Sequence, residues 1–476
     1  MNRSESKQAG KSEGRLFKYL IYFIFIYAIA SNVVCLFGVE FFGISFGFEW
    51  LVWLFTALLG ALVFFLPKVK LTEKRGLITG FVLMNGIMVT VLGTFNTQPV
   101  SDYYVIYTMA VDMAGGNFDI HKYAPWSYEY LFNWQLGIAW IESLIFRLFA
   151  HSLTLLKLVD LALINLTAWL VYVYARRRLG SREATYSFLA FSVFYPVLIC
   201  VGQFSNQIVV TPLILLFLLL IDKEHYLIAG VLLPIISLVR PIGIVLLLAV
   251  VILLIYRGIH NKTRWNNTLK HLAFFILPCV GVSFLISGLF VRNNLADSDI
   301  YTAKLSYFKF HQGLNIDSWE GPAERVESLG GDIDAYNEWE KNVVKEAYTS
   351  QLPSTIGNNF RKMTMFLGSF DWKFAPTYNL VVPEFNNPVI TTCVSFGWAE
   401  YFVCLVAALM GYKIYRRRNG LDLFQVLFVG LVCVYFFIEA WPGYRYELYP
   451  FVIILAGPGL MKIRAAHKNL GNFLGH

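Results

Sequence analysis

The sequence predicts an all-α protein that crosses a membrane many times. Hydrophobic residues make up 57% of the 476 positions and the mean hydropathy is +0.56, both well above the values of an average soluble domain. These residues stand in uninterrupted runs, such as 17–39 and 272–291, that approach the roughly 20 residues needed to cross about 30 Å of hydrocarbon. Backbone groups in hydrocarbon must be satisfied internally, so each run is expected to be a helix.

Basic residues gather in the short segments between the apolar runs. The positive-inside rule places such segments in the cytoplasm, so topology explains the net charge of +8 better than nucleic-acid binding does. The first run begins next to Lys7, Lys11, Arg15 and Lys18 and lacks a clear cleavage site, which is typical of a retained signal anchor. The basic segments are the amino terminus and residues 68–75, 176–182, 257–270, 416–418 and 462–468.

About thirteen apolar stretches are visible, but two cytoplasmic termini require an even number of crossings, so we expect about twelve transmembrane helices. The stretch 131–150 carries several polar residues and is expected to lie along the outer interface. A second suspect, 225–256, is interrupted by prolines and is either a short hairpin or one kinked helix. The predicted organisation is amino-terminal helices in 1–94, a catalytic outer loop in 95–130, a helix core in 131–292, a large outer loop in 293–393 and carboxy-terminal helices in 394–476.

The large outer loop shows helical patterning at 333–349 and 355–367, separated by Pro353, and is expected to be a lid-like insert. Glycine-rich phosphate loops are absent from the sequence, which argues against ATP-driven transport and a nucleotide-binding Rossmann domain. The six cysteines show neither CxxC spacing nor pairing in loops, so neither a disulfide framework nor a zinc site is expected.

Candidate chemistry lies at the predicted outer mouth. Asp102 follows an apolar helix and opens a polar, aromatic loop, as a catalytic base would. Arg240 and Arg445 mark ends of apolar segments, where a charge is costly unless it is paired or functional. A base for an acceptor hydroxyl and cations for a departing phosphate are what group transfer from a lipid phosphate needs.

In this respect the chain resembles the GT-C superfamily of polytopic glycosyltransferases, which use polyprenyl-phosphate sugars as donors. The similarity lies in an early outer-loop acid before a helix, an aromatic patch, an Arg-Pro helix start and a late Arg-Tyr element, all in the family's order. The segments are Ser101-Asp102-Tyr103-Tyr104, the aromatic stretch 123–134, Leu238-Val239-Arg240-Pro241-Ile242-Gly243, Gly313-Leu314-Asn315, and Trp441-Pro442-Gly443-Tyr444-Arg445-Tyr446 with Tyr449-Pro450.

The resemblance implies roles for these positions. Asp102 is the expected catalytic base, and Arg240, Arg445 and Lys122 are expected to bind the donor phosphate. Candidate substrate contacts are Asp112, His121, Tyr103, Tyr123 and Tyr444.

The chain departs from the family in two respects. Paired neighbouring acids are common in the family's first loop, whereas the acid nearest to Asp102 is Asp112. Three apolar segments, instead of one, precede that loop. A lone carboxylate holds a divalent ion poorly, so we expect no cofactor and no obligatory metal.

Each of these residues also has a purely structural interpretation. Asp102 could cap the following helix, and Asp112 could be a solvated surface acid. Arg240 could cap a helix end or extend to the lipid headgroups, and Arg445 could pair with Glu447. His121 and Lys122 could be ordinary interfacial residues, and the aromatic residues a membrane belt.

The predicted function is sugar transfer from a polyprenyl-phosphate donor to a cell-envelope glycan, glycolipid or protein, by inverting displacement on the outer face of a bacterial plasma membrane. The expected partners are therefore the lipid-linked sugar, the acceptor and membrane lipids, with no nucleic acid. The alternatives are a flippase for lipid-linked saccharides, which needs no base, and an envelope polysaccharide polymerase or ligase, which leaves Asp102 without a role.

Overall fold

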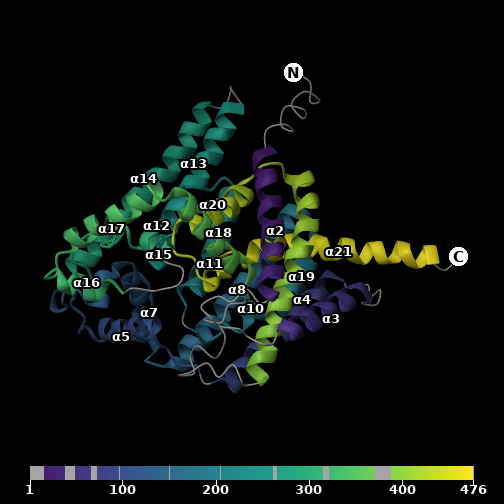
Figure 1. The fold of residues 1–476 in the computed structure, drawn as a ribbon, viewed down its shortest axis with the longest axis horizontal. Helices are drawn as coiled ribbons and strands as arrows, with labels where there is room; N and C mark the ends of the chain where they lie inside the picture. The colour runs from purple at the N-terminus through teal and green to yellow at the C-terminus, as the bar shows by residue number, and fades with distance from the viewer. Residues whose placement is uncertain are drawn as a thin grey trace.

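We describe the protein from a computed structural model, in which the described residues are 15–37, 49–65, 72–95, 97–149, 151–203, 205–260, 265–314, 321–369 and 388–474. Throughout these residues the regular elements are helices, so the predicted all-α class is confirmed (Figure 1). Lys7, Lys11, Lys68 and Lys70, which belong to predicted basic segments, lie outside the described residues. The α-helices before the large insert are α2 (Arg15–Leu36), α3 (Glu49–Phe65), α4 (Glu73–Thr94), α5 (Asp102–Gly115), α6 (Tyr128–Leu131), α7 (Leu136–Phe149), α8 (Leu153–Leu179), α9 (Ser181–Val193), α10 (Tyr195–Leu198), α11 (Asn206–Asp222), α12 (Tyr226–Val239), α13 (Gly243–His260) and α14 (Trp265–Arg292).

The insert and the carboxy-terminal part contain the remaining helices. In the insert, α17 begins and ends where the sequence predicts, and α18 starts just before Pro353, which occupies the first turn, where proline is tolerated. These helices are α15 (Phe308–Leu314), α16 (Pro322–Ser328), α17 (Ile333–Thr349), α18 (Leu352–Gly368), α19 (Pro388–Asn419), α20 (Leu423–Phe437) and α21 (Tyr449–Leu474).

Five helices are long and apolar enough to cross a membrane, and six shorter apolar helices accompany them within the described residues. Together they come close to the predicted twelve. The long candidates are Arg15–Leu36, Glu73–Thr94, Leu153–Leu179, Trp265–Arg292 and Thr391–Asn419; the shorter ones are Trp50–Leu62, Asn206–Asp222, Tyr226–Val239, Gly243–Ile259, Leu423–Phe437 and Tyr449–Ile463.

The two ambiguous stretches have distinct structures. Within 131–150, residues 136–149 form the 14-residue α7, which packs against α5 and is not among the apolar candidates for a span. Residues 225–256 form a hairpin: α12 begins at Tyr226 beside His271 of α14, and Gly258 near the end of α13 lies against Trp265 of the same helix. The chain therefore turns back between α12 and α13, at Arg240.

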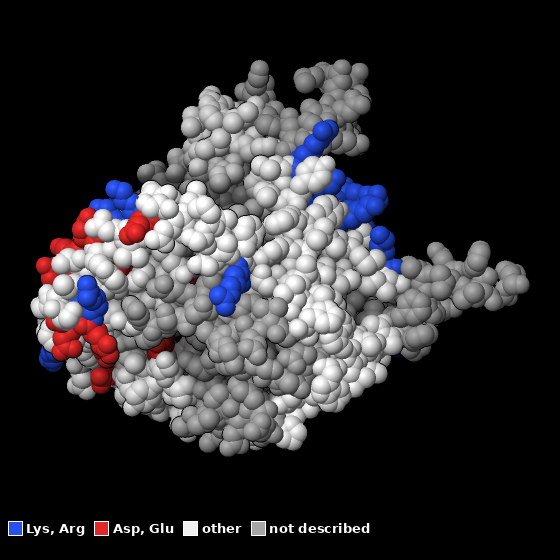
Figure 2. Space-filling model, viewed as in Figure 1, with Lys and Arg blue, Asp and Glu red and all other residues white. Residues whose placement is uncertain are grey.

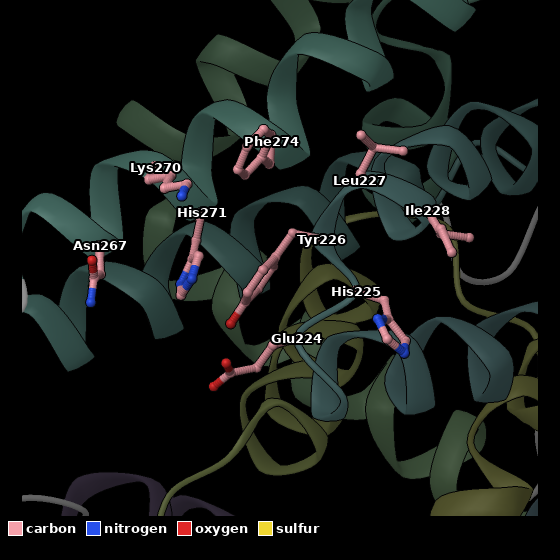
Figure 3. A pocket seen from close by; sticks show the side chains of 9 residues that line it. All are labelled: Glu224, His225, Tyr226, Leu227, Ile228, Asn267, Lys270, His271 and Phe274. Atoms are coloured by element: carbon pink, nitrogen blue, oxygen red, sulfur yellow. The ribbon is translucent and has the colours of Figure 1, made fainter.

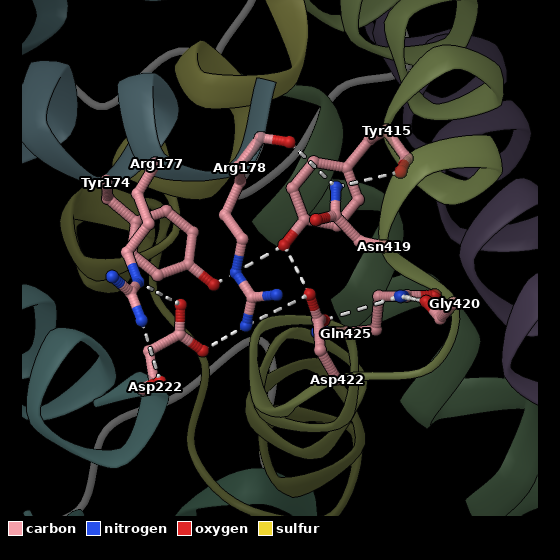
Figure 4. Close-up of polar contacts among 9 residues, drawn as sticks. All are labelled: Tyr174, Arg177, Arg178, Asp222, Tyr415, Asn419, Gly420, Asp422 and Gln425. Atoms are coloured by element: carbon pink, nitrogen blue, oxygen red, sulfur yellow. Dashed lines mark hydrogen bonds and ion pairs between the residues drawn. The ribbon is translucent and has the colours of Figure 1, made fainter. Parts of the chain in front are cut away.

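One end of the bundle, here called the basic end, collects the helix termini that carry basic clusters (Figure 4). Arg178, near the end of α8, forms ion pairs with Asp222 at the end of α11 and with Asp422, which caps α20. Arg418, near the end of α19, pairs with Glu183 of α9 at 2.8 Å. Basic segments that are far apart in the sequence thus meet at one end, as the positive-inside rule requires.

The opposite end, here called the insert end, joins the two predicted outer loops. The hydroxyl of Tyr130 donates to Asp297 at 2.7 Å, and Asn133 donates to the carbonyl of Thr302 at 2.8 Å. Leu131 and Phe308 are buried in the same small apolar core. Figure 2 shows acidic side chains gathered over the insert helices, and basic side chains gathered where α2 begins and α19 ends.

The insert is also fixed to the first helix. Asn32 of α2 donates to the carbonyl of Leu367 at 3.0 Å, and Trp398 of α19 donates both to Asn32 and to the carbonyl of Gly368. Gly368 is required here, because a Cβ atom would lie 2.5 Å from the backbone of Ser31. The insert therefore packs against α2, which belongs to the predicted amino-terminal unit.

Candidate active site

Asp102 lies at the start of α5, directly after a strained residue. Ser101 adopts a positive φ of 52°, which is unusual for a residue other than glycine and often marks a functional site. Ser101 occupies the N-cap position, so the capping role considered for Asp102 is wrong by one residue. Asp102 is instead the first helical residue, where the helix dipole stabilises its exposed negative charge.

The sequence fixes the orientation of α5 through one apolar face. Ile106, Met109, Ala110 and Met113 recur at helical spacing and are buried, and α5 packs against α7. The helix ends at Gly116, which adopts the left-handed conformation that glycine permits. Because this face is anchored, the carboxylate at the exposed first turn has a defined position.

Two tyrosines lie within electrostatic reach of Asp102. Burial raises the pKa of Tyr128 well above its ordinary value, and the negative charge of Asp102 raises it further. The pKa of Tyr444 is also raised, first by burial, then by Glu439, and Asp102 adds to this effect. Both phenols therefore stay protonated as hydrogen-bond donors at neutral pH, close to the Asp102 carboxylate.

Arg240 approaches the same tyrosine from the end of α12. Its guanidinium lies over the ring of Tyr444, 4.7 Å from the ring centre, and forms an ion pair with Glu447. It also donates to Asn206 at 3.3 Å and to the hydroxyl of Tyr435 at 3.4 Å, both long for hydrogen bonds. Desolvation lowers the pKa of Arg240, but the charge of Glu447 and the hydrogen bond to Tyr435 raise it by more, so Arg240 stays charged despite its burial.

The local helix type explains which side chains face Arg240. Residues 442–447 form a 3-10 helix, η6 (Pro442–Glu447), in which side chains three positions apart lie above one another. Tyr444 and Glu447 consequently share a face, and both contact Arg240. Arg445 lies about 120° away on this helix and points elsewhere. Arg445 is 1% exposed, and its guanidinium lies over the ring of Tyr401 at 4.7 Å and donates to the carbonyl of Pro442.

Glu439 connects this group to the insert. Its carboxylate accepts from Trp441 and pairs with Lys309 of α15, both at 2.5 Å, and it is hydrogen-bonded to Tyr444. The backbone NH of Glu439 donates to the carbonyl of Lys309 at 2.8 Å. The insert thereby adds a partly exposed cation, Lys309, beside Tyr444.

The helix that packs against α5, α7, contains a buried acid. Glu142 is 6% exposed, and its Oε2 has no hydrogen-bond partner within the described part of the chain. Burial, and then the charge of Asp160 in α8, raises the pKa of Glu142 well above its ordinary value. Burial and the neighbouring acid thus both favour the neutral form of Glu142, which lowers the cost of placing this acid in an apolar stretch.

The remaining predicted contacts form a second group at the other end of α5. Asp112 lies ten residues from Asp102, about 15 Å along the helix. Burial raises the pKa of Tyr123, and the charges of Glu129 and then of Asp112 raise it further, so Asp112 acts on Tyr123 and not on the tyrosines near Asp102. His121 and Lys122 are exposed on the short 3-10 helix η1 (Ile120–Lys122) beside Tyr123.

The structure thus brings together only part of the predicted site. Asp102, Tyr444 and Arg240 converge, and Tyr103 lies close to Tyr128, whose pKa it also raises. Arg445 is next to this group in sequence but faces Tyr401. Among the residues that the structure describes, no three His, Cys, Asp or Glu side chains are grouped around a common metal position.

Sequence reasoning missed Glu439 and Lys309, included Tyr128 only as part of the aromatic stretch 123–134, and assigned Glu447 to the wrong arginine. Glu447 pairs with Arg240, not with the Arg445 that lies two positions away in sequence. Two acids, Glu439 and Glu447, flank an aromatic Arg-Tyr segment at the end of an apolar helix. Acids next to an apolar helix are costly unless they are paired or functional, and this signal could have pointed to Glu439 and Glu447.

Comparison with known proteins supports a glycosyltransferase. The family model described as dolichyl-phosphate-mannose-protein mannosyltransferase matches residues 136–286, from α7 into α14. This segment includes Arg240 and Asn206 but neither Asp102 nor Tyr444. A search of curated protein sequences finds no match.

Among solved structures, the chain is similar to ArnT from Cupriavidus metallidurans bound to undecaprenyl phosphate, with a TM-score of 0.39, 12% identity and coverage of 80% of this chain and 77% of that one. The apo state of the same protein gives a TM-score of 0.35, 12% identity and coverage of 80% and 78%. Both scores lie below 0.5, so this likeness by itself establishes neither a shared ligand nor a shared site. The family match over residues 136–286 is what confirms the predicted resemblance of this chain to the polytopic glycosyltransferases of the GT-C superfamily.

Proposed function

We propose that the protein transfers a sugar from a polyprenyl-phosphate donor to an acceptor hydroxyl at the insert end, on the outer face of a bacterial plasma membrane. The observation that carries this proposal is the convergence of a carboxylate, Asp102, and a guanidinium, Arg240, around Tyr444. A base and a cation at one place are what transfer from a phosphate leaving group requires. The family match supports a lipid-phosphate sugar as the donor.

In the proposed reaction, the carboxylate of Asp102 takes the proton of the acceptor hydroxyl. The acceptor oxygen then forms a bond to the anomeric carbon while the bond from that carbon to the phosphate oxygen breaks. One displacement inverts the anomeric centre, and polyprenyl phosphate leaves with the bonding electron pair. Arg240 would stabilise the negative charge that develops on this phosphate.

Three further cations, Lys309, Lys122 and Arg445, are candidate contacts for the donor phosphate. Lys309 pairs with Glu439, which is hydrogen-bonded to Tyr444, and we therefore add Lys309 as a candidate contact for the donor phosphate. Lys122 and Arg445 remain predicted phosphate contacts. Substrate binding would have to bring Lys122 toward Asp102, because it lies with the second group near Tyr123. The acceptor is expected to be a cell-envelope glycan, glycolipid or protein.

Asp102→Asn tests the base. The amide keeps the size of the side chain but cannot accept the proton, so transfer should fall by about 10²- to 10⁴-fold. The assay follows release of polyprenyl phosphate from a short-chain donor by purified protein in detergent. Asp112→Asn is the matched control, because it makes the same change on the same helix about 15 Å away, and it should retain most activity.

Full transfer by folded Asp102→Asn protein would rule out Asp102 as the base. A different outcome would change the function altogether. If wild-type protein releases no polyprenyl phosphate but moves lipid-linked sugars across liposome membranes, it is a transporter.

The proposed sidedness has its own test. Single cysteines at Ser127 and Ser328, one in each outer loop, are introduced into a background without native cysteines. Both should react with a membrane-impermeant thiol reagent on intact cells, because both belong to the insert end. Protection of both until the cells are lysed would place the site in the cytoplasm.

A further inference from the structure

A groove of about 520 Å³ lies at the basic end, between the start of α12 and the first turns of α14 (Figure 3). The proposed sugar transfer makes no use of it. It is lined by residues 224–228 and by side chains from the first turns of α14.

The polar part of the groove is rich in groups that can donate to an anion. Lys270, His271 and Asn267 project from the first turns of α14, and His225 from the residue before α12. Arg257 supports the groove from α13 through a side-chain hydrogen bond to Tyr226. Against these groups the lining contains one carboxylate, Glu224.

Ring packing fixes the middle of the groove. The rings of Tyr226 and His271 are stacked, with centres 4.4 Å apart and an angle of 22° between their planes. Figure 3 shows these two rings side by side, with Lys270 and Phe274 on the same helix as His271. Tyr226 is buried, so His271 is held by a rigid neighbour and its imidazole has a defined position.

The remainder of the lining is apolar and faces outward. Leu227 and Ile228 are 54% and 53% exposed, and Phe274 is 45% exposed. They belong to apolar helices, and α14 has the least buried window of the five long candidate spans. On a helix that crosses a bilayer, such side chains face lipid tails, and the polar groups at its end lie at headgroup level.

We propose that this groove binds the headgroup of an anionic phospholipid, with the phosphate near Lys270 and His271 and the acyl chains along Leu227, Ile228 and Phe274. The arrangement is amphipathic in the way that a phospholipid is, and basic pockets between membrane helices suit anionic headgroups. The site is separate from the proposed donor site. The 14-residue α12 runs from this groove to Arg240 and so separates the two by about 20 Å.

Native mass spectrometry of the full-length protein tests the proposal. The protein in detergent is mixed with equal amounts of phosphatidylglycerol and phosphatidylcholine that have the same acyl chains. Wild-type protein should retain phosphatidylglycerol preferentially. Lys270→Gln removes one cation and should lower its apparent affinity about fivefold. The control is Lys413→Gln, which removes an exposed lysine near the carboxy-terminal end of α19, also at the basic end, and should leave affinity unchanged.

A second measurement locates the lipid. Diazirine-labelled phosphatidylglycerol should form crosslinks to residues 225–228 and 267–274, and Lys270→Gln should reduce them. Equal retention of the two lipids, or an equal loss in Lys270→Gln and Lys413→Gln, would overturn the proposal. Displacement of the lipid by millimolar inorganic phosphate or glycerol phosphate would also overturn it, because the groove would then be a site for soluble anions.

Discussion

Arg178 at the basic end and Arg240 at the insert end are both largely shielded from solvent, but they are paired differently. At the basic end, Arg178 faces two carboxylates, Asp222 and Asp422. At the insert end, Arg240 faces one carboxylate, Glu447, and its other acceptors are an amide and a phenol at 3.3 and 3.4 Å. Exposure does not separate them, because the Arg178 side chain is 18% exposed and that of Arg240 is 11% exposed.

The two arginines differ in their ion-pair and hydrogen-bond partners more than in their exposure. A phosphate that approached Arg178 would meet two carboxylates already in place, and the hydroxyl of Tyr415 holds Asp422 with a hydrogen bond of 2.6 Å. A phosphate that approached Arg240 could replace two long, neutral hydrogen bonds with short, charge-assisted ones. We therefore interpret Arg178 as part of the scaffold and Arg240 as part of the site.

The largest expected effect is on stability at the basic end. Arg178→Met should lower the free energy of unfolding by about 3–5 kcal/mol, because Asp422 and Asp222 would keep buried charges without this cation. Thermal unfolding in detergent measures this loss, and Arg182→Met, at an exposed arginine, is the control. Transfer per folded molecule should stay at the wild-type level. An unchanged unfolding temperature would contradict the scaffold interpretation.

A paired substitution distinguishes the arginines most directly. Arg240→Met leaves Glu447 buried and unpaired, so both stability and transfer should fall. Adding Glu447→Met should restore stability but leave transfer about a hundredfold below wild type, because the phosphate still lacks its cation.

At the other end, adding Asp422→Leu to Arg178→Met should restore only part of the stability, because Asp222 still lacks Arg178 and α20 loses its N-cap, but transfer per folded molecule should stay at the wild-type level. Arg240→Lys keeps the charge but loses the planar fork, so a loss of about tenfold is expected in kcat/KM. Recovery of transfer in the double variant at Arg240 would show that Arg240 is also only part of the scaffold.

The smallest expected effect is a pH dependence of stability caused by Lys362, a buried lysine whose described hydrogen bonds are to carbonyl oxygens. Lys362 of α18 donates to the backbone carbonyls of Ile438 and Gly313 at 2.7 and 3.1 Å and to the side chain of Asn359. Burial lowers its pKa to about 7, against a partial opposing effect of Glu439.

The sign of the pH dependence follows from this lowered pKa. Above pH 7 the folded protein holds Lys362 neutral, while the unfolded chain still binds the proton up to its ordinary pKa. Stability relative to Lys362→Met should therefore rise above pH 7, by about 1 kcal/mol per pH unit. Unfolding temperatures of both proteins from pH 6 to 9 measure the difference. A constant difference would mean that Lys362 stays charged throughout.

Many of the helices could be predicted from the sequence, because apolar length and helical periodicity are local properties. The predicted bounds of the insert helix at 333–349 match the structure to the residue, and the prolines in 225–256 predict an interruption in that stretch. The sequence could not choose between a hairpin and a kink there, because that choice depends on the packing of α12 and α13 against α14.

The sequence by itself determined that Asp102 opens a helix next to an apolar segment and that Arg240 ends one. Only the tertiary structure decided what these residues face. Arg445 and Tyr444 are neighbours in the chain, but on a 3-10 helix they point about 120° apart, so Tyr444 and Glu447 meet Arg240 while Arg445 meets Tyr401. Local patterns fix which residues form a helix, and contacts between segments hundreds of residues apart fix which of them make a site.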